Sequence, residues 1–298
     1  MIIKTATYSA SSLIFSKIRA FLELVKFRLS LLVSFSSAMG YLLGNSGDIS
    51  WNKFFLFTIG GFLISGSAVT INQVLEREYD KIMKRTMKRP LPTLRVSVTE
   101  GLLFALVTFS AGAFLLAWYA NMLTTILSTI SLVLYAFIYT PLKRVGPIAV
   151  FVGAIPGAFP PLLGWIAATG EISAGALLIF LIQFIWQFPH FWAIAWLADE
   201  DYKKAGFKLL PGNSQSNRFA GLQIMLFTLM LLPAGLLPLR FGITGISSAI
   251  VVTLGGIYLF ILSAGFLKNN SHKSALKIMY GSFLYLPLVL ISLLIDKV

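Results

Sequence analysis

The 298-residue chain has no cysteine and few charged side chains. Without cysteine, disulfide bonds and thiolate chemistry are excluded. Charged residues make up only 12% of the chain and hydrophobic residues 57%, whereas about one quarter of the residues in a soluble globular protein are charged. This shortage of charge excludes an ordinary soluble domain and indicates a membrane protein that crosses the bilayer several times.

Apolar runs of a length suited to membrane-spanning helices recur along the whole chain. We count nine of them, at about residues 29–44, 54–75, 101–119, 122–140, 147–168, 174–197, 219–239, 243–267 and 275–295. In the fifth run, prolines and glycines alternate, which predicts either a close approach to a neighbouring helix or an opening into a cavity. The sequence therefore predicts an all-α membrane protein with nine transmembrane helices.

The segment before the first run shows no signal-peptide pattern, because no small-residue cleavage site precedes Lys17 and Arg19. Apolar residues between positions 18 and 25 recur at helical spacing beside basic residues, which is typical of a helix lying at the membrane interface. We therefore divide the chain into a cytoplasmic segment, 1–28, and a nine-helix transmembrane domain, 29–298.

The basic residues are distributed unevenly between the two sides of this arrangement. With the N-terminus placed in the cytoplasm, 21 of the 24 Lys and Arg residues lie on the cytoplasmic side, and only Lys53, Arg240 and Lys297 lie opposite. This asymmetry predicts a cytoplasmic N-terminus and a periplasmic C-terminus. No Arg- and Ser-rich extension precedes the first run, which favours a bacterial inner membrane over a mitochondrial one. The predicted topology thus explains the net charge of +13, and binding to nucleic acid is not needed to explain it. Membrane lipid is the expected surrounding of the protein.

Six of the eleven acidic residues form two clusters on the predicted cytoplasmic side, Glu76, Glu78 and Asp80 after the second run and Asp199, Glu200 and Asp201 after the sixth. Asn72, Glu76 and Asp80 are four residues apart, so on a helix they share one face. Two carboxylates about 6 Å apart repel by about 2 to 3 kcal/mol at an effective dielectric constant near 20. A cation between them would relieve this repulsion. Mg²⁺ holding a polyanion such as a diphosphate suits a site with so few carboxylates.

Basic residues that follow the first acidic cluster supply hydrogen-bond donors for such a diphosphate. They are Lys84, Arg85, Lys88 and Arg89, and the pair Lys143 and Arg144 follows the fourth run. Arginine favours forked contacts with phosphate oxygens, and the two arginines of the first group are four residues apart. The alternative is that these bases only fix the membrane topology, which we prefer for Lys88. A solvated, salt-bridged loop is the corresponding alternative for the acids.

His190 lies within the sixth apolar run, directly after Pro189. An ionisable side chain at membrane depth usually indicates a functional site. The alternative is a histidine that only hydrogen-bonds a backbone carbonyl freed by the proline. From the residues themselves, both interpretations stay open.

These segments together resemble the UbiA superfamily of intramembrane prenyltransferases. The first signature is Asn72-x-x-x-Glu76-x-x-x-Asp80 followed by Arg85-Thr86-x-x-Arg89-Pro90-Leu91-Pro92. The similarity continues through Tyr139-x-x-x-Lys143-Arg144, Gly157-x-x-Pro160-Pro161, Trp186-Gln187-x-Pro189-His190 and Asp201-Tyr202. It spans about residues 20–215, and the Trp-Gln-x-Pro-His wording is similar to that of the heme-using branch of the family.

The resemblance implies one bundle of nine helices around a central cavity. It implies heme B and farnesyl diphosphate as substrates, heme O and diphosphate as products, and Mg²⁺ as the cofactor. By resemblance, the catalytic residues are Asn72, Glu76, Asp80 and Asp201, and the metal ligands are Asn72, Glu76, Asp80, Asp199 and Asp201. The diphosphate ligands are Lys84, Arg85, Arg89, Lys143 and Arg144, and the heme contacts are Trp186, Gln187 and His190. A partnership with a heme A synthase or a terminal-oxidase assembly is left open.

Two departures from the family pattern bear on the metal site. Glu76 stands where many members have Asp, and Leu197 stands where the second Asp-x-x-x-Asp signature begins, which leaves the second half one carboxylate short. Three alternative functions remain: a prenyltransferase acting on an aromatic quinone precursor, a secondary transporter, and a structural assembly factor. Charged residues collect at one surface and are almost absent from mid-membrane, which argues against the transporter.

Overall fold

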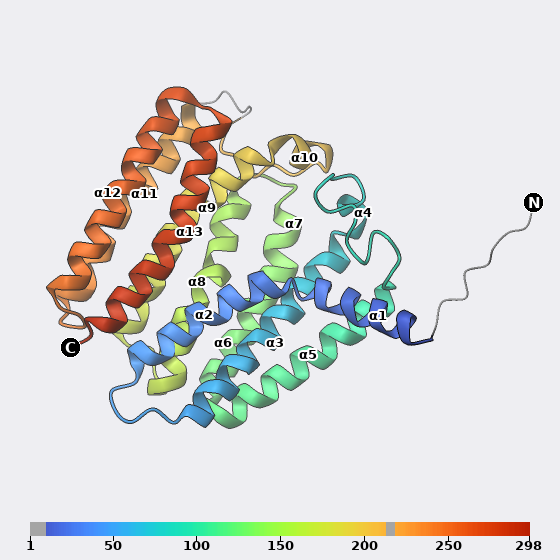
Figure 1. Cartoon of the computed structure of the whole chain (residues 1–298), viewed down its shortest axis with the longest axis horizontal. Helices are drawn as coiled ribbons and strands as arrows, with labels where there is room; N and C mark the ends of the chain where they lie inside the picture. The colour runs from blue at the N-terminus through green and yellow to red at the C-terminus, as the bar shows by residue number, and fades with distance from the viewer. Residues whose placement is uncertain (1–9, 213–217) are drawn as a thin grey trace, which may run out of the picture.

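The computed structural model describes residues 10–212 and 218–298, and these residues are almost entirely helical (Figure 1). The helices are α1 (Ala10–Leu24), α2 (Phe27–Gly44), α3 (Trp51–Leu75), α4 (Arg77–Asp80), α5 (Val98–Tyr119), α6 (Met122–Val133), a π-helix (Leu134–Tyr139), α7 (Thr140–Leu142), α8 (Ile148–Thr169), α9 (Ala174–Leu197), α10 (Asp199–Lys204), α11 (Arg218–Arg240), α12 (Ile246–Asn269) and α13 (His272–Ile295). Within the described ranges, nine helical segments are long and apolar enough to cross a membrane. The prediction of an all-α bundle with nine transmembrane helices is confirmed.

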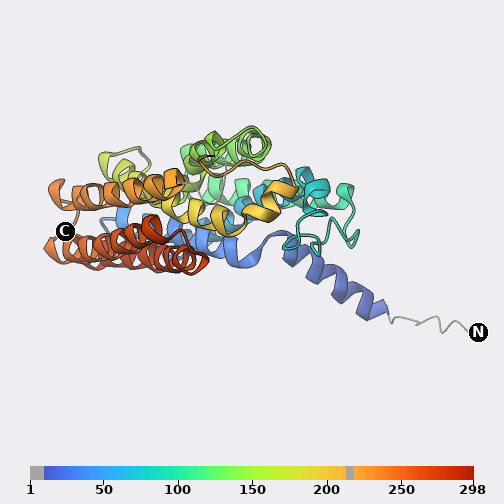
Figure 2. The same ribbon diagram turned by 90° about the horizontal axis from the view of Figure 1, so that it is seen from above.

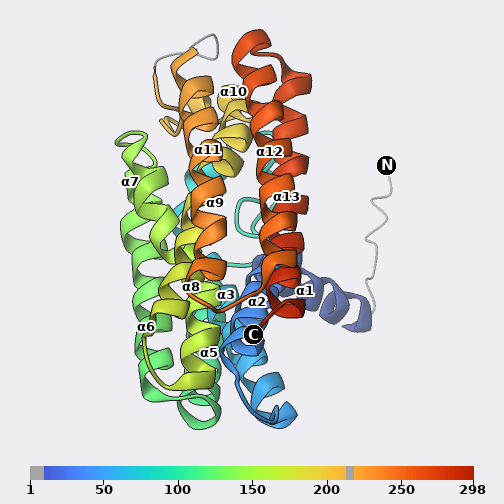
Figure 3. The same ribbon diagram turned by 90° about the vertical axis from the view of Figure 1, so that its left-hand side faces the viewer.

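The spanning helices form two groups that meet along α2, α8 and α9. Helices α11 and α13 pack beside α9, and α12 packs against both of them, whereas α3 and α5 pack together on the other side (Figures 1 and 3). Helix α1 extends away from the bundle, as Figure 2 shows. The short helices α4 and α10, far apart in sequence, lie near each other at one end, and the C-terminus lies at the opposite end (Figure 1). This end of the bundle therefore collects the segments that carry both acidic clusters.

Helices α2 and α8 approach each other so closely that glycine is required at their contact. A Cβ atom at Gly164 would overlap the backbone carbonyl of Ser37, and one at Gly40 would overlap that of Pro161. Other small residues of α8, among them Gly153 and Gly157, line a cavity on the same helix. The Pro/Gly-rich run thus both approaches a neighbouring helix closely and lines a cavity, the two alternatives that the sequence left open.

The fourth span is not the single α-helix that the apolar run predicts. Residues Leu134–Tyr139 form a π-helix between α6 and α7. The hydroxyl of Thr140 donates to the carbonyl of Tyr135, five residues back, at 2.9 Å. Short π-helices inside α-helices often mark functional sites. Here the π-helix carries Tyr135 and Tyr139, which both line the cavity.

The second span is interrupted at one residue, Glu76, before the helix reaches Asp80. Helix α3 ends at Leu75, Glu76 has φ −92° and ψ 3°, and α4 resumes for one turn. The amide of Glu76 nevertheless donates to the carbonyl of Asn72 at 2.9 Å, and the amide of Asp80 to that of Glu76 at 2.8 Å. The predicted four-residue spacing along the backbone is therefore kept across the break.

Candidate active site

A cavity lies at the centre of the bundle, between α2, α3, the π-helix, α8, α9 and α13. Its volume of about 390 Å³ falls within the range usual for small-molecule sites. Its lining is mostly apolar, with Arg85 and Tyr202 contributed by the loop after α4 and by α10, and with Gln187 and His190 contributed by α9. The central cavity implied by the family resemblance is thus present, and its lining includes His190 as well as Arg85 and Tyr202, which follow the two acidic clusters in sequence.

Glu76 and Lys143 form a buried ion pair beside this cavity. The Lys143 Nζ atom lies 2.7 Å from Glu76 Oε1, and both side chains are nearly buried. Lys143 also lies over the ring of Tyr139, 4.8 Å from its centroid. Burial opposes the charge on Lys143, but the Glu76 carboxylate more than offsets burial and holds the lysine pKa above its ordinary value. A predicted metal ligand and a predicted diphosphate ligand are therefore brought together.

Asp80 and Arg89 form the second such pair. Asp80 is fully buried, and Arg89 Nη1 donates to both of its carboxylate oxygens at 2.8 and 3.0 Å. The hydroxyl of Thr86 donates to the Asp80 carbonyl at 3.0 Å, so the loop after α4 folds back over this helix. Each of the two buried acids of the first cluster thus has its own base.

The side-chain amide of Asn72 has a defined orientation. Thr140 has one hydroxyl hydrogen, and it donates this hydrogen to the Tyr135 carbonyl. The Thr140 oxygen must then accept from Asn72, whose Nδ2 lies 2.9 Å away. The Asn72 Oδ1 atom consequently points away from Thr140, and it is the atom of this side chain that can ligate a metal ion.

The second acidic cluster meets the first segment through Arg85. Its backbone N–H donates to Asp201 Oδ2 at 3.3 Å, and its Nη2 donates to the Tyr202 hydroxyl at 2.6 Å. The guanidinium also lies over the Tyr202 ring, 4.5 Å from its centroid. Asp199, in contrast, pairs with Lys203 of its own helix at 2.6 Å. The predicted contact between the two acidic segments is therefore made by Asp201.

Two predicted diphosphate ligands lie at the margin of the site. Lys84 is exposed and forms no ion pair within the part of the chain that the structure describes. Arg144 is exposed and donates to the Tyr79 hydroxyl at 2.6 Å. Over residues 10–212 and 218–298, no three His, Asp or Glu side chains lie close enough together to hold a metal ion by themselves. A metal ion bound at this end would therefore also need ligands other than His, Asp and Glu side chains.

Lys26 belongs to this charged end, although the sequence indicated only a topological role for it. It is half-buried at the junction of α1 and α2, where its φ of 44° is left-handed. Burial lowers the pKa of its ammonium group to about 7, and the positive charges of Arg89 and Lys143 act in the same direction. Lys26 thus lies within electrostatic range of both ion pairs. From the sequence alone, Lys26 cannot be distinguished from the nearby Arg28, because the left-handed backbone turn that orients Lys26 has no sequence signal.

His190 lines the cavity from α9. Its Nδ1 atom lies 2.9 Å from Ser282 Oγ, and its ring is stacked on Trp186 with centroids 4.8 Å apart. The Trp186 indole N–H donates to the Ser282 carbonyl at 2.8 Å. The partner of His190 is therefore a side chain of α13, and not a carbonyl freed by Pro189.

Gln187 lies one residue after Trp186 and is buried against α8. Its Nε2 donates to the Ala154 carbonyl at 3.0 Å and to the Gln183 carbonyl at 3.2 Å. The side chain lines the cavity, but its donors already hold α9 against α8. The structure thus gives Gln187 a packing role in addition to the predicted heme contact, which stays a prediction.

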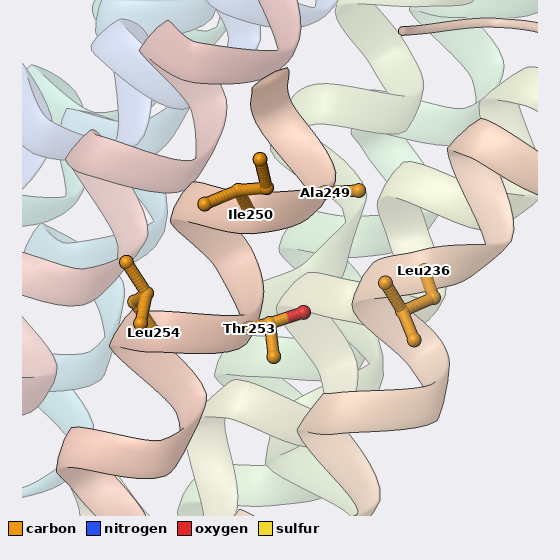
Figure 4. A pocket seen from close by; sticks show the side chains of 5 residues that line it. All are labelled: Leu236, Ala249, Ile250, Thr253 and Leu254. Atoms are coloured by element: carbon orange, nitrogen blue, oxygen red, sulfur yellow. The ribbon is translucent and has the colours of Figure 1, made fainter. Parts of the chain in front are cut away.

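A small groove between α11 and α12 is a separate feature of the bundle surface (Figure 4). It is lined by Leu236, Ala249, Ile250, Thr253 and Leu254. None of these side chains is ionisable, so the groove offers no group for acid, base or diphosphate chemistry.

The chain matches known proteins over most of its length. The model of the UbiA prenyltransferase family matches residues 33–286. The chain is 52% identical to the protoheme IX farnesyltransferase of Cytophaga hutchinsonii, over 95% of this chain and 99% of that protein. It is 40% identical to the protoheme IX farnesyltransferase of Flavobacterium psychrophilum, over 93% of this chain and 94% of that protein.

Solved structures share the fold at low sequence identity. A digeranylgeranylglyceryl phosphate synthase superimposes with a TM-score of 0.78 at 20% identity, covering 94% of this chain and 98% of that one. A UbiA homolog from Archaeoglobus fulgidus bound to GPP and Mg²⁺ gives a TM-score of 0.65 at 15% identity, covering 92% of this chain and 99% of that one. The family match, the two relatives and the shared fold lead to one conclusion: the chain belongs to the UbiA prenyltransferase family.

Proposed function

We propose that this protein transfers the farnesyl group of farnesyl diphosphate to a vinyl group of heme B, giving heme O and diphosphate. The observation that carries the proposal is a mostly apolar cavity that adjoins a charged site and is also lined by a histidine among aromatic rings. Its lining residues Arg85 and Tyr139 contact Asp201 and Lys143, which belong to the segments with the buried acids and their bases. The names of the 52% and 40% identical relatives support heme B as the acceptor.

The charged end suits a diphosphate bound with Mg²⁺. Asn72, Glu76, Asp80 and Asp201 offer oxygen ligands only, and Mg²⁺ prefers oxygen ligands and often takes several of them from substrate phosphates. Bound there, Mg²⁺ would supply Lewis-acid stabilisation of the departing diphosphate. Asp199 is a further proposed ligand, and it would have to leave Lys203.

The two ion pairs define what the bases do when substrate enters. In the structure, Lys143 neutralises Glu76 and Arg89 neutralises Asp80. A metal at the carboxylates would displace these bases, which are then free to donate to diphosphate oxygens. Arg85 adds positive charge nearby, Lys26 does so in its protonated form, and Lys84 and Arg144 are proposed outer contacts. This is electrostatic stabilisation of the leaving group as the allylic C–O bond breaks.

The apolar middle of the cavity suits the reacting carbon atoms. Its lining excludes water from the allylic cation until the vinyl carbon attacks. A water molecule then adds to the resulting porphyrin-side cation and loses a proton, which completes the hydroxyethylfarnesyl group. His190, Trp186 and Gln187, which line the same cavity, are the proposed contacts to heme.

The experiment that tests the proposal is heme O formation in isolated membranes supplied with heme B, farnesyl diphosphate and Mg²⁺. We expect Asp80→Asn to abolish product, because it removes a buried carboxylate of the metal site. Glu78→Gln is the matched control, since Glu78 is exposed and pairs only with Arg77 and Lys81. A rate for Asp80→Asn close to that of the wild type would refute the site assignment.

A quinone-precursor prenyltransferase remains the second candidate within the family. Labelled farnesyl diphosphate offered with heme B or with 4-hydroxybenzoate, followed by chromatography of the products, separates the two functions. Prenylated 4-hydroxybenzoate without heme O would favour this alternative. A secondary transporter no longer has support, because the chain belongs to a prenyltransferase family.

We further propose a bacterial inner membrane as the location, with the N-terminus in the cytoplasm. Residues 1–28 would form the cytoplasmic segment and 29–298 the transmembrane domain. Helix α1 supports an interfacial position, because it leaves Ile14, Phe15, Ile18 and Leu22 exposed on a helix that also carries Lys17 and Arg19. A partnership with a heme A synthase or a terminal-oxidase assembly stays a prediction.

A further inference from the structure

Four residues of α9 and α13 form a compact polar cluster beside the cavity. His190 Nδ1 lies 2.9 Å from Ser282 Oγ. The Ser282 hydroxyl donates to the Met279 carbonyl at 2.8 Å. The Trp186 indole N–H donates to the Ser282 carbonyl at 2.8 Å. All three contacts lie within the transmembrane region, where little water is available to replace them.

The hydrogen atoms in this cluster can be counted. A serine hydroxyl has one hydrogen and two lone pairs, and a backbone carbonyl can only accept. The Ser282 hydroxyl has an acceptor in the Met279 carbonyl at 2.8 Å, and with its hydrogen there its oxygen accepts from His190. This arrangement, which satisfies both contacts, puts the imidazole hydrogen on Nδ1.

This tautomer leaves Nε2 with a free lone pair. Nε2 forms no hydrogen bond with any of the residues that the structure describes, although His190 is 95% buried and lines the cavity. A histidine whose Nδ1–H is held by an oxygen acceptor, with Nε2 unoccupied, has the arrangement found in most histidine ligands of metal ions.

The ring is also prevented from turning. Trp186 stacks on one face, with centroids 4.8 Å apart and an interplanar angle of 15°. Phe283 contacts the ring edge-on at 4.6 Å and 79°. A flip of the imidazole would break the Ser282 bond without a replacement, so one orientation is strongly preferred.

We infer that Ser282 is a positioning residue that holds His190 in its Nδ1–H tautomer and presents Nε2 to the iron of the heme substrate. This inference rests on the proposed function, because it needs heme in the cavity. It adds a residue on α13, outside the sequence motifs described above, and assigns the two ring nitrogens separate roles.

The test is heme binding by the purified full-length chain in detergent. Ferric heme B is titrated while the Soret band is recorded, and the iron–imidazole stretching frequency of the ferrous complex is measured by resonance Raman spectroscopy. Prenyl diphosphate binding, measured on the same samples, reports whether each variant is folded.

For His190→Ala we expect loss of the iron–imidazole band, and added imidazole should restore an axial ligand. For Ser282→Ala we expect about tenfold weaker heme binding, the lower end of what loss of a partner to a ligating histidine costs. Its stretching frequency should also fall, because the Nδ1–H group no longer has an acceptor. Ser282→Thr keeps the hydroxyl and should restore the frequency.

Two outcomes would overturn the inference. One is an unchanged iron–imidazole band in His190→Ala. The other is a Ser282→Ala variant with wild-type affinity and wild-type frequency. Neither outcome bears on heme O formation in the Asp80 experiment, so failure of this inference is distinguishable from failure of the proposed function. A wild-type chain that prenylates another acceptor and binds no heme would instead refute both.

Discussion

At the scale of single residues, the site is built from charges that are already paired. Glu76 and Asp80 are buried, and each is held by one base at 2.7 and 2.8 Å. A buried carboxylate left without its base is strongly destabilising. The bases therefore have two tasks, to keep the protein folded and to receive the diphosphate, and a single substitution affects both.

A double substitution separates these two tasks. We expect Lys143→Met to lower the free energy of unfolding by about 3 kcal/mol, because Glu76 is then buried without a counter-charge. Adding Glu76→Gln removes that charge and should restore most of the stability, since a neutral buried pair lacks the desolvation cost. Activity should be lost in both variants, because metal and diphosphate ligands are missing.

Thermal unfolding in detergent and heme O formation are the two measurements for this series. The exposed pair of Arg77 and Glu78 is the control, and its removal should change stability by less than about 1 kcal/mol. A double variant as unstable as Lys143→Met would contradict the explanation, and so would an active double variant.

At the scale of helices, the cavity depends on close contacts between neighbouring spans. Helix α8 touches α2 through glycines, and its prolines and glycines also open the space in front of α9. The π-helix turns Tyr135 and Tyr139 toward the same space. These helices carry few charged side chains, so they contribute to the site by shaping the cavity.

The glycine contact makes a prediction about packing. Gly164→Ala should lower the free energy of unfolding by about 2 kcal/mol, because the new Cβ overlaps the Ser37 carbonyl and forces α2 and α8 apart. The measurement is thermal unfolding of the purified protein.

Gly265→Ala is the matched control for this prediction. Gly265 also lies inside a spanning helix, and among the described residues no atom outside its own stretch of helix backbone lies within 4 Å of the position that its Cβ would take. We expect that substitution to be neutral or stabilising, because alanine favours a helix. Equal effects at the two positions would show that the α2–α8 contact can relax.

At the scale of the whole molecule, sidedness follows from the arrangement of charge. The segments that carry the acidic clusters and most of the bases lie at one end of the bundle, and the C-terminus lies at the other (Figure 1). We therefore expect this charged end to face the cytoplasm.

Because the chain has no cysteine, its topology can be tested with single introduced cysteines. Lys84→Cys should resist a membrane-impermeant maleimide in intact cells and react after permeabilisation. Ser46→Cys, in the opposite loop before α3, should react in intact cells. The reverse pattern would overturn the proposed orientation.

The family resemblance and the helix count were predictable from the sequence because they depend on local patterns. The length of an apolar run can be read directly from the sequence, and the spacing of Asn72, Glu76 and Asp80 lies within one short segment. Three site features were not predictable. The turn at Lys26 and the π-helix at 134–139 are backbone departures without a strong local signal, and Ser282 lies 92 residues from His190.

By itself, the sequence determined that this protein spans a membrane nine times and that it carries acids and bases suited to a metal-bound diphosphate. Those properties follow from composition, run length and spacing. Only the tertiary structure decided which base faces which acid, how Asn72 is oriented, and that the histidine is anchored by α13. These are contacts between helices distant in the chain, and their partners are chosen by packing and by the need to satisfy every buried polar group.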